Sequence, residues 1–137
     1  MAESTVRLLL WRSGAIRCGA PIQRVARVLP HPPVTAIPDA PPAVLGVSNI
    51  EGKLVTVVDC RVLLGEPAPG PGAELVLVRV GTRTVGLAVD EVKDIVVVAD
   101  RALLPGRDGR EWEADLGGGA TATLLDLDAL LAPLFPD

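Results

Sequence analysis

Residues 6–20, VRLLLWRSGAIRCGA, and residues 73–87, AELVLVRVGTRTVGL, carry one pattern written twice in this chain. In each stretch a leucine-rich or β-branched run ends at a glycine-bearing turn and a second apolar run follows, which is typical of a β-hairpin. A duplication of one small unit explains the matches, which are mostly apolar residues and turn glycines, and chance coincidence is the alternative. The offset of 67 pairs identical residues along the chain: Leu8 with Leu75, Leu10 with Leu77, Arg12 with Arg79, Gly14 with Gly81, Gly19 with Gly86, Val25 with Val92, Pro38 with Pro105, Gly52 with Gly119, Thr56 with Thr123, Asp59 with Asp126, Leu63 with Leu130 and Leu64 with Leu131.

Further strands are expected after each opening hairpin. Apolar residues recur every three positions there, which favours a turn that leads into a strand. The members are Ile22, Val25 and Val28 in the first half, and Val89, Val92 and Ile95 in the second. The proline-rich segments 30–33 and 38–42 are predicted to be surface connections, since proline lacks an amide hydrogen. Beyond them, 44–48 and 54–58 are predicted strands that flank a hairpin tip at 49–52, where Gly52 is free to take a positive φ angle.

Each half is predicted to close with a capped helix. Asp59 precedes a helical stretch that ends at Gly65, which suits an N-cap and a glycine stop. Asp126 stands in the same relation to residues 127–131. We therefore assign Asp59 and Asp126, with the turn glycines Gly14 and Gly81, to folding.

Short strands at regular spacing with few helical stretches favour an all-β chain built as two small barrels or sandwiches. We expect a single domain over 1–137, with sub-barrels at roughly 6–66 and 73–134 joined by a Pro/Gly linker at 66–72. Each half alone is marginal in size, so the two should share an apolar interface. The sequence leaves open whether the first strand pairs with its own half or crosses to the other.

Composition argues against several classes of function. The chain of 137 residues has two Trp, one Phe, no Tyr and a net charge of −4, which speaks against binding nucleic acid. No apolar run approaches the length of about 18 residues that crosses a bilayer, so we expect no direct membrane insertion. Residues 1–5 lack the features of a secretory signal, and we expect a soluble, cytoplasmic protein.

The usual catalytic groups are scarce. His31 is the single histidine, lies among prolines, and has no metal-ligating residue at a suitable spacing. Cys18 and Cys60 are too few and too isolated for a disulfide framework or a zinc site, so we interpret them as small buried residues. Residues 117–119 are three glycines, which we assign to a turn because no phosphate-loop residues follow them. We expect no catalytic residue, no cofactor and no metal.

Aspartates are the remaining candidates for acid–base chemistry. Asp59 and Asp126 occupy equivalent capping positions, which a structural role explains and a single active site does not. Asp90, Asp94 and Asp128 add no further motif. A small β-barrel enzyme that uses Asp59 or Asp90 is kept as a remote alternative. The favoured class is a binding protein, in which an edge strand or the groove between two barrels accepts a partner helix through apolar residues such as Ile22, Val25 or Val44.

Residues 37–59, IPDAPPAVLGVSNIEGKLVTVVD, resemble the signature of CheW-like domains. That pattern is a proline, a short spacer, Gly-Val-x-Asn-hydrophobic-Arg-Gly, an apolar strand that contains a proline, and Val-Asp. The likeness extends to the opening hairpins, to residues 85–92 (VGLAVDEV) and to residues 124–127 (LLDL), and so covers nearly the whole chain.

The resemblance implies a fold and a function. The fold is two five-stranded SH3-like barrels packed on a common core, with short helices. The function is that of a non-enzymatic adapter that links the cytoplasmic hairpin of a chemoreceptor, a methyl-accepting chemotaxis protein, to the regulatory domain of a CheA-type histidine kinase. On this reading the partner-binding residues are Ile22, Val25, Gly46, Val47, Asn49, Glu51 and Gly52.

Three departures from the family pattern stand out. Glu51 replaces the usual arginine, which reverses the charge near the expected partner surface. Thr56 stands where proline is common, and residues 101–121 are shorter than usual and acidic. These changes favour altered partner choice, in the form of a divergent adapter that binds the receptor but not the kinase. The alternative for Glu51 is a neutral replacement at an exposed loop tip.

Overall fold

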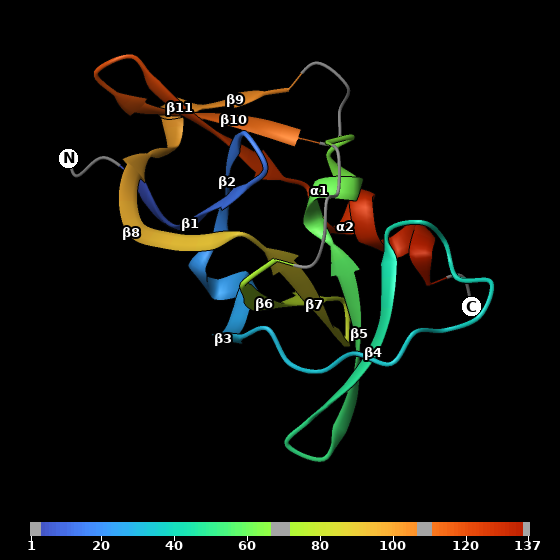
Figure 1. Ribbon diagram of the computed structural model, residues 1–137. Coiled ribbons are helices and arrows are strands. Elements are labelled where there is room, and N and C mark those ends of the chain that lie inside the picture. The colour runs from blue at the N-terminus through green and yellow to red at the C-terminus, as the bar shows by residue number, and fades with distance from the viewer. Residues whose placement is uncertain (1–3, 67–71, 107–110, 136–137) are drawn as a thin grey trace.

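The computed structural model describes residues 4–66, 72–106 and 111–135, and these residues form two β-sheets with a few short helices (Figure 1). The expectation of an all-β chain with short helices is confirmed. The strands are β1 Thr5–Ser13, β2 Ile16–Pro21, β3 Val25–Pro30, β4 Val44–Ile50, β5 Lys53–Asp59, β6 Glu74–Val80, β7 Arg83–Val89, β8 Glu91–Ala99, β9 Leu103–Pro105, β10 Glu111–Gly117 and β11 Ala120–Leu125. The α-helices are α1 Cys60–Leu63 and α2 Leu127–Leu131, and the 3-10 turns are η1 Ile22–Arg24, η2 Asp100–Ala102 and η3 Ala132–Leu134.

The two opening hairpins have the predicted form. Strands β1 and β2 pair antiparallel up to Ser13 opposite Ile16, and β6 and β7 pair up to Val80 opposite Arg83. Gly14 and Gly81 each take a φ of 61° in the turn, a conformation that costs glycine little. The residues matched by the offset of 67 therefore occupy equivalent places in the backbone.

The predicted sub-barrels 6–66 and 73–134 are wrong, because each sheet takes strands from both halves. The order is β8-β1-β2-β11-β10-β9 in the six-stranded sheet and β3-β6-β7-β5-β4 in the five-stranded sheet. The first hairpin thus lies among strands of the second half, and the second hairpin among strands of the first. Parallel pairing of β2 with β11 and of β5 with β7 makes this exchange possible. Apart from its two end residues, the linker predicted at 66–72 lies outside the described residues.

Among the described residues, buried apolar side chains form three clusters, and the largest lies between the two sheets. This shared core takes Leu9 and Trp11 from β1, and Val76 and Val78 from β6. Their neighbours Leu8 and Leu10 point to the other face of β1 and belong to a second cluster, which packs on the six-stranded sheet. Leu75 and Leu77 belong to the third cluster, which packs on the five-stranded sheet. Both faces of each opening hairpin are therefore buried, which explains its nearly continuous apolar sequence.

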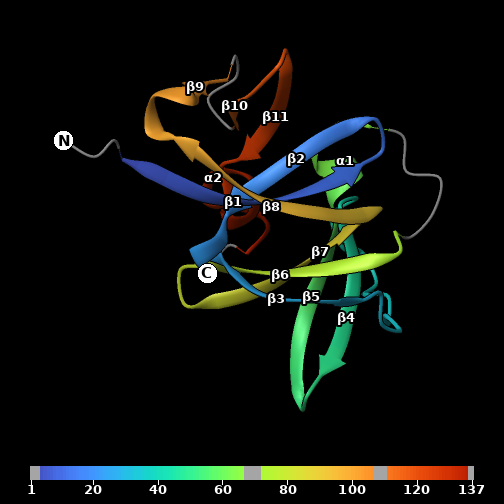
Figure 2. The same cartoon turned by 90° about the vertical axis from the view of Figure 1, so that its left-hand side faces the viewer.

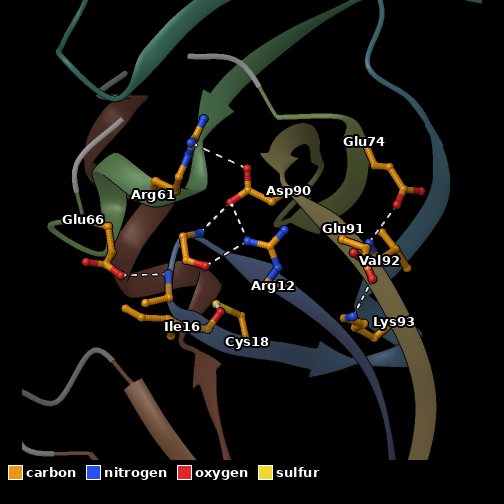
Figure 3. A network of polar contacts seen from close by, with 12 residues as sticks. Arg12, Ile16, Cys18, Arg61, Glu66, Glu74, Asp90, Glu91, Val92 and Lys93 are labelled. Carbon is orange, nitrogen blue, oxygen red and sulfur yellow. Dashed lines mark hydrogen bonds and ion pairs between the residues drawn. The ribbon is translucent and has the colours of Figure 1, made fainter. Parts of the chain in front are cut away.

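Charged groups join the two sheets at one edge of the shared core (Figure 3). Asp90, which follows β7, accepts a hydrogen bond of 2.5 Å from the amide of Gly14 and lies 3.7 Å from the guanidinium of Arg12 in β1. Arg61 of α1 is buried, and its nitrogens lie 3.6 Å from Asp90 and 3.7 Å from Asp59. The charge of Arg61 is thus compensated inside the protein, as a buried guanidinium requires.

The second short helix carries a related contact with the charges exchanged. Position 128 is equivalent to position 61 by the offset of 67. There, Asp128 of α2 forms an ion pair with Arg24 of η1, with 2.9 Å between the nitrogen and the oxygen. Arg24 also donates two hydrogen bonds to the carbonyl of Arg79, at the end of β6. Each of the two short α-helices is therefore tied to another element by an ionic contact.

The capping predictions are confirmed. Asp59 Oδ1 accepts a 2.9 Å hydrogen bond from the amide of Arg61, and Asp126 Oδ1 accepts a 3.1 Å hydrogen bond from the amide of Ala129. Gly65 ends the first helix with a φ of 75°. Asp59 is buried and also lies beside the Arg61 guanidinium, whereas Asp126 is only half-buried.

Replacing the two caps with alanine should therefore cost different amounts of stability. We expect Asp59→Ala to lower the free energy of unfolding by about 1–2 kcal/mol, because a cap and a buried charge partner are both lost. Asp126→Ala should cost about 0.5–1 kcal/mol. Urea denaturation of both variants beside the wild type measures the difference, and equal losses would contradict the role given to Asp59.

Candidate functional site

An apolar strip lies where the shared core reaches the surface between β3 and β8. Ile22, Val25 and Val92 are half-buried and pack against the shared core. Ile95 and Val97 of β8 follow them, with 57% and 58% of their surface exposed. We call these five residues, together with Val28, the seam strip.

The sheet registers show why these side chains share a face with the shared core. Ile95 lies opposite Leu9, and Val92 lies opposite Trp11, in the pairing of β8 with β1. Val28 lies opposite Val76 in the pairing of β3 with β6. Residues directly opposite each other in an antiparallel pair point to the same face. The seam strip is therefore the exposed continuation of the shared core.

Both strands that carry the strip are sheet edges. Strand β8 ends the six-stranded sheet and β3 ends the five-stranded sheet. In Figure 2, β8 crosses in front of β1, and β6 and β3 run below it. The equivalent pairs Val25 with Val92 and Val28 with Ile95 place similar apolar residues on these two edge strands.

The tip of the hairpin between β4 and β5 is a second exposed feature. Glu51 and Gly52 have φ angles of 52° and 85°, and Asn49 Oδ1 accepts a 2.9 Å hydrogen bond from the amide of Gly52. Two successive positive φ angles are typical of a tight hairpin turn. The three residues are exposed, and the neighbouring Leu54 has 76% of its surface exposed.

Glu51 has a partner within the protein. Its carboxylate forms an ion pair with the guanidinium of Arg27, which lies in β3. Strand β3 and strand β4 are at opposite ends of the sheet order, so the ion pair links one edge strand to the hairpin tip that follows the other. The negative charge of Glu51 at the tip is therefore paired with the positive charge of Arg27, which lies next to the seam strip.

Two of the residues predicted to face a partner have packing roles. Gly46 is buried, with a φ of 149°, and a Cβ atom there would overlap the carbonyl oxygen of Thr35. Val47 is half-buried and exchanges two backbone hydrogen bonds with Thr35, at 2.8 and 2.9 Å. Gly46 therefore does not belong to the exposed surface, and it serves the close approach of the loop before β4.

The structure brings the predicted residues into two neighbouring groups. Ile22 and Val25 belong to the seam strip, and Asn49, Glu51 and Gly52 form the hairpin tip. Sequence reasoning had not assigned Arg27, Ile95 or Val97 to the site. The offset of 67, applied to Val25 and Val28, points to Val92 and Ile95. No comparable pattern in the sequence reveals the partner of Glu51.

The two aspartates of the enzyme alternative are engaged in structural contacts. Asp59 caps α1. Asp90 accepts a hydrogen bond from the Gly14 amide and forms ion pairs with Arg12 and Arg61. Within residues 4–66, 72–106 and 111–135, no three metal-ligating side chains gather at one place. None of the short helices in these ranges is long and apolar enough to cross a bilayer.

Comparisons with known proteins agree on one family. The family model of the CheW-like domain matches residues 7–134. The chain is 33% identical over 132 residues to the chemotaxis protein CheW of Rhizobium meliloti, covering 90% of this chain and 85% of that protein. It is 26% identical over 143 residues to the chemotaxis protein CheW of Klebsiella aerogenes, covering 96% and 86%.

A solved structure confirms the fold. The crystal structure of the scaffolding protein TtCheW from Thermoanaerobacter tengcongensis superposes with a TM-score of 0.85 at 20% identity, and the match covers 93% of this chain and 92% of that one. The expected pair of SH3-like barrels is thereby confirmed. One of the two sheets has a sixth strand, the three-residue β9.

Alanine substitutions at Gly46 and at Gly52 should show that Gly46 is needed for close packing, whereas Gly52 is needed only for its backbone conformation. Gly46→Ala should destabilise the protein by about 2–3 kcal/mol, because the new methyl group meets the Thr35 backbone. Gly52→Ala has open space around it and should cost about 1 kcal/mol through its φ angle alone. Thermal and urea unfolding measure both, and a loss at Gly46 no larger than at Gly52 would contradict the assignment.

Proposed function

The chain belongs to the CheW-like family of chemotaxis proteins, and from this premise we propose that it is a non-enzymatic adapter between a chemoreceptor and a CheA-type histidine kinase. Its place of action is then the cytoplasm, where the receptor hairpin and the kinase domain meet. The receptor is assigned to the seam strip, and the regulatory domain of the kinase to the hairpin tip of β4 and β5.

The seam strip is the observation that carries the receptor assignment. A helical hairpin presents apolar residues along one face, and such a face packs into a groove between two elements. The strip offers Val25, Val28, Val92 and Ile95 in equivalent positions on two edge strands, above a shared core that holds both strands in place. Charged residues surround it, with Arg27 on β3 and Lys93 and Asp94 on β8.

The kinase assignment rests on the exposed tip and on its family position. Asn49 and Gly52 match the family pattern, and Glu51 and Leu54 are exposed beside them. Glu51 puts a negative charge where the family usually has a positive one. The ion pair with Arg27 reduces the repulsion between this carboxylate and an acidic partner, because the carboxylate already has a cation nearby. A rigid adapter with two separate surfaces lets a movement of the receptor bias the kinase.

A divergent adapter that binds only the receptor is the second candidate, favoured by Glu51 in place of arginine. Immobilised protein offered a receptor signalling hairpin and a kinase regulatory domain separately tells the two apart. Retention of both supports the coupling function, and retention of the receptor alone supports the divergent adapter. Retention of neither would contradict both, provided that circular dichroism shows the immobilised protein to be folded.

A charge placed in the seam strip should weaken receptor binding. Ile95→Glu should lower the affinity for the receptor hairpin about tenfold or more, because it puts a carboxylate into an apolar contact. Leu104→Glu is the matched control, since Leu104 on β9 is 56% exposed and lies on another strand. Isothermal titration measures both affinities, and an equal effect of the two variants would remove the strip from the proposal.

Exchanging the charges of Arg27 and Glu51 should distinguish the effect of their ion pair on stability from the effect of residue 51 on kinase binding. Glu51→Arg alone faces Arg27 and should lose about 0.2–1 kcal/mol of stability through repulsion. The double variant Arg27→Glu, Glu51→Arg restores the pair and presents the arginine that the family usually has. We expect the double variant to regain the lost stability and to bind the kinase domain more tightly than the wild type. An unchanged kinase affinity would show that the tip does not set specificity.

A further inference from the structure

Arg7 of β1 is an exposed cation beside the apolar residues of the seam strip. It lies directly opposite Val97 in the pairing of β1 with β8, so the two side chains share one face of the sheet. On the other side of β1, Leu8 pairs with Pro21, and Ile22 of the strip follows Pro21 in the chain. The guanidinium of Arg7 therefore belongs to the same surface as the seam strip.

The charge of Arg7 is not compensated by another side chain. Within the part of the chain that the structure describes, its guanidinium forms no hydrogen bond and no ion pair. The cations on the neighbouring elements η1, β3 and β8 are Arg24, Arg27 and Lys93, and each of them forms an ion pair with a carboxylate. Arg7 thus keeps its N–H donors available to a second molecule.

The duplication shows how the same position is used when it has a structural role. The offset of 67 leads from Arg7 to Glu74, at the start of β6. Glu74 is half-buried, and its carboxylate accepts a 2.8 Å hydrogen bond from the amide of Val92, near the start of β8 (Figure 3). The second half therefore uses its charged residue to attach β8. A contact of this kind accounts for Glu74 and does not account for Arg7.

We propose that Arg7 determines which receptor hairpins bind to the seam strip, by forming an ion pair with a carboxylate on the bound helix. This inference rests on the proposed function, in which a chemoreceptor hairpin covers the strip. The partner is then a helical hairpin whose apolar face is interrupted by a glutamate or an aspartate.

The geometry of β1 indicates where that carboxylate lies on the helix. Arg7 and Leu9 are two residues apart in β1, and Ile95 of the strip lies opposite Leu9. Two residues of a strand span about 7 Å, and one turn of an α-helix rises by about 5.4 Å. In a helix that runs along β8, the residue one turn away from the apolar contact with Ile95 is therefore level with Arg7. The carboxylate is expected at this spacing.

Covering the strip makes the ion pair selective. When a helix packs on Ile95 and Val97, water is excluded and the attraction between the guanidinium and a carboxylate becomes stronger. A helix with an apolar residue at that position would leave the desolvated guanidinium unpaired, and a lysine there would repel it. The planar guanidinium also suits a carboxylate through paired hydrogen bonds. Arg7 therefore favours hairpins with an acidic residue at this place and disfavours the others.

Charge reversal at Arg7 tests this proposal. The probe is a soluble receptor signalling hairpin, titrated calorimetrically into the full chain. We expect Arg7→Glu to lower the affinity about tenfold or more, and Arg7→Gln to lower it by a smaller factor. Because Arg7 is exposed and has no internal partner, both variants should keep the circular dichroism spectrum and the melting temperature of the wild type.

Arg17→Glu is the matched control, since it changes the net charge by the same amount. Arg17 of β2 is exposed and lies opposite Arg12, on the face of the six-stranded sheet that is turned away from Trp11 and the shared core. We expect this variant to bind the hairpin within about twofold of the wild type, because a distant exposed charge is screened by salt.

Lysine substitutions in the hairpin identify the partner carboxylate. Each acidic residue of the hairpin is changed to lysine in turn, and each product is titrated into the wild type and into Arg7→Glu. One hairpin variant should bind the wild type weakly and bind Arg7→Glu about tenfold more tightly than the unaltered hairpin does. Lysine at the other acidic positions should give effects that add to that of Arg7→Glu.

Two negative results have different meanings. The wild type binds the hairpin and Ile95→Glu prevents binding, but Arg7→Glu behaves like Arg17→Glu, or no lysine variant of the hairpin restores binding: the role of Arg7 is then wrong and the adapter function stands. If the wild type does not bind the hairpin at all, the receptor assignment itself is wrong, and the role of Arg7 is wrong with it.

Discussion

Burial of both faces of the opening hairpins is the constraint on which the rest of the structure depends. Leu8 and Leu10 fill one sheet while Leu9 and Trp11, on the opposite face of the same strand, fill the core between the sheets. Such a hairpin finds too little apolar surface within its own half. Each hairpin is therefore inserted among strands of the other half, and the two halves stabilise each other across one shared core.

The candidate site follows from this arrangement. The edge strands β3 and β8 end beside the shared core, and their apolar residues continue it to the surface. Ionic contacts from Arg61 to Asp90 and from Arg24 to Asp128 hold the short helices against the two sheets. A surface carried by strands that belong to packed sheets keeps its shape, which the proposed adapter function would require.

Glu51 illustrates how a local departure from a family pattern changes meaning in the folded chain. Taken alone, a glutamate in place of arginine predicts repulsion from an acidic partner. The fold places Arg27 of β3 against it, although the two residues are distant in sequence and lie on strands at opposite ends of one sheet. The hairpin tip therefore presents an ion pair, in which the carboxylate comes from Glu51 and the guanidinium from Arg27.

The sequence by itself determined the features that depend on neighbouring residues. The two hairpins, the glycine turns at Gly14 and Gly81, the caps at Asp59 and Asp126 and the pairs matched by the offset of 67 all rest on local patterns or on self-comparison. Only the tertiary structure decided which sheet each hairpin joins and that Gly46 is buried against the Thr35 backbone. These contacts join segments far apart along the chain, and their register is set by burial on both faces of a strand, which local periodicity does not specify.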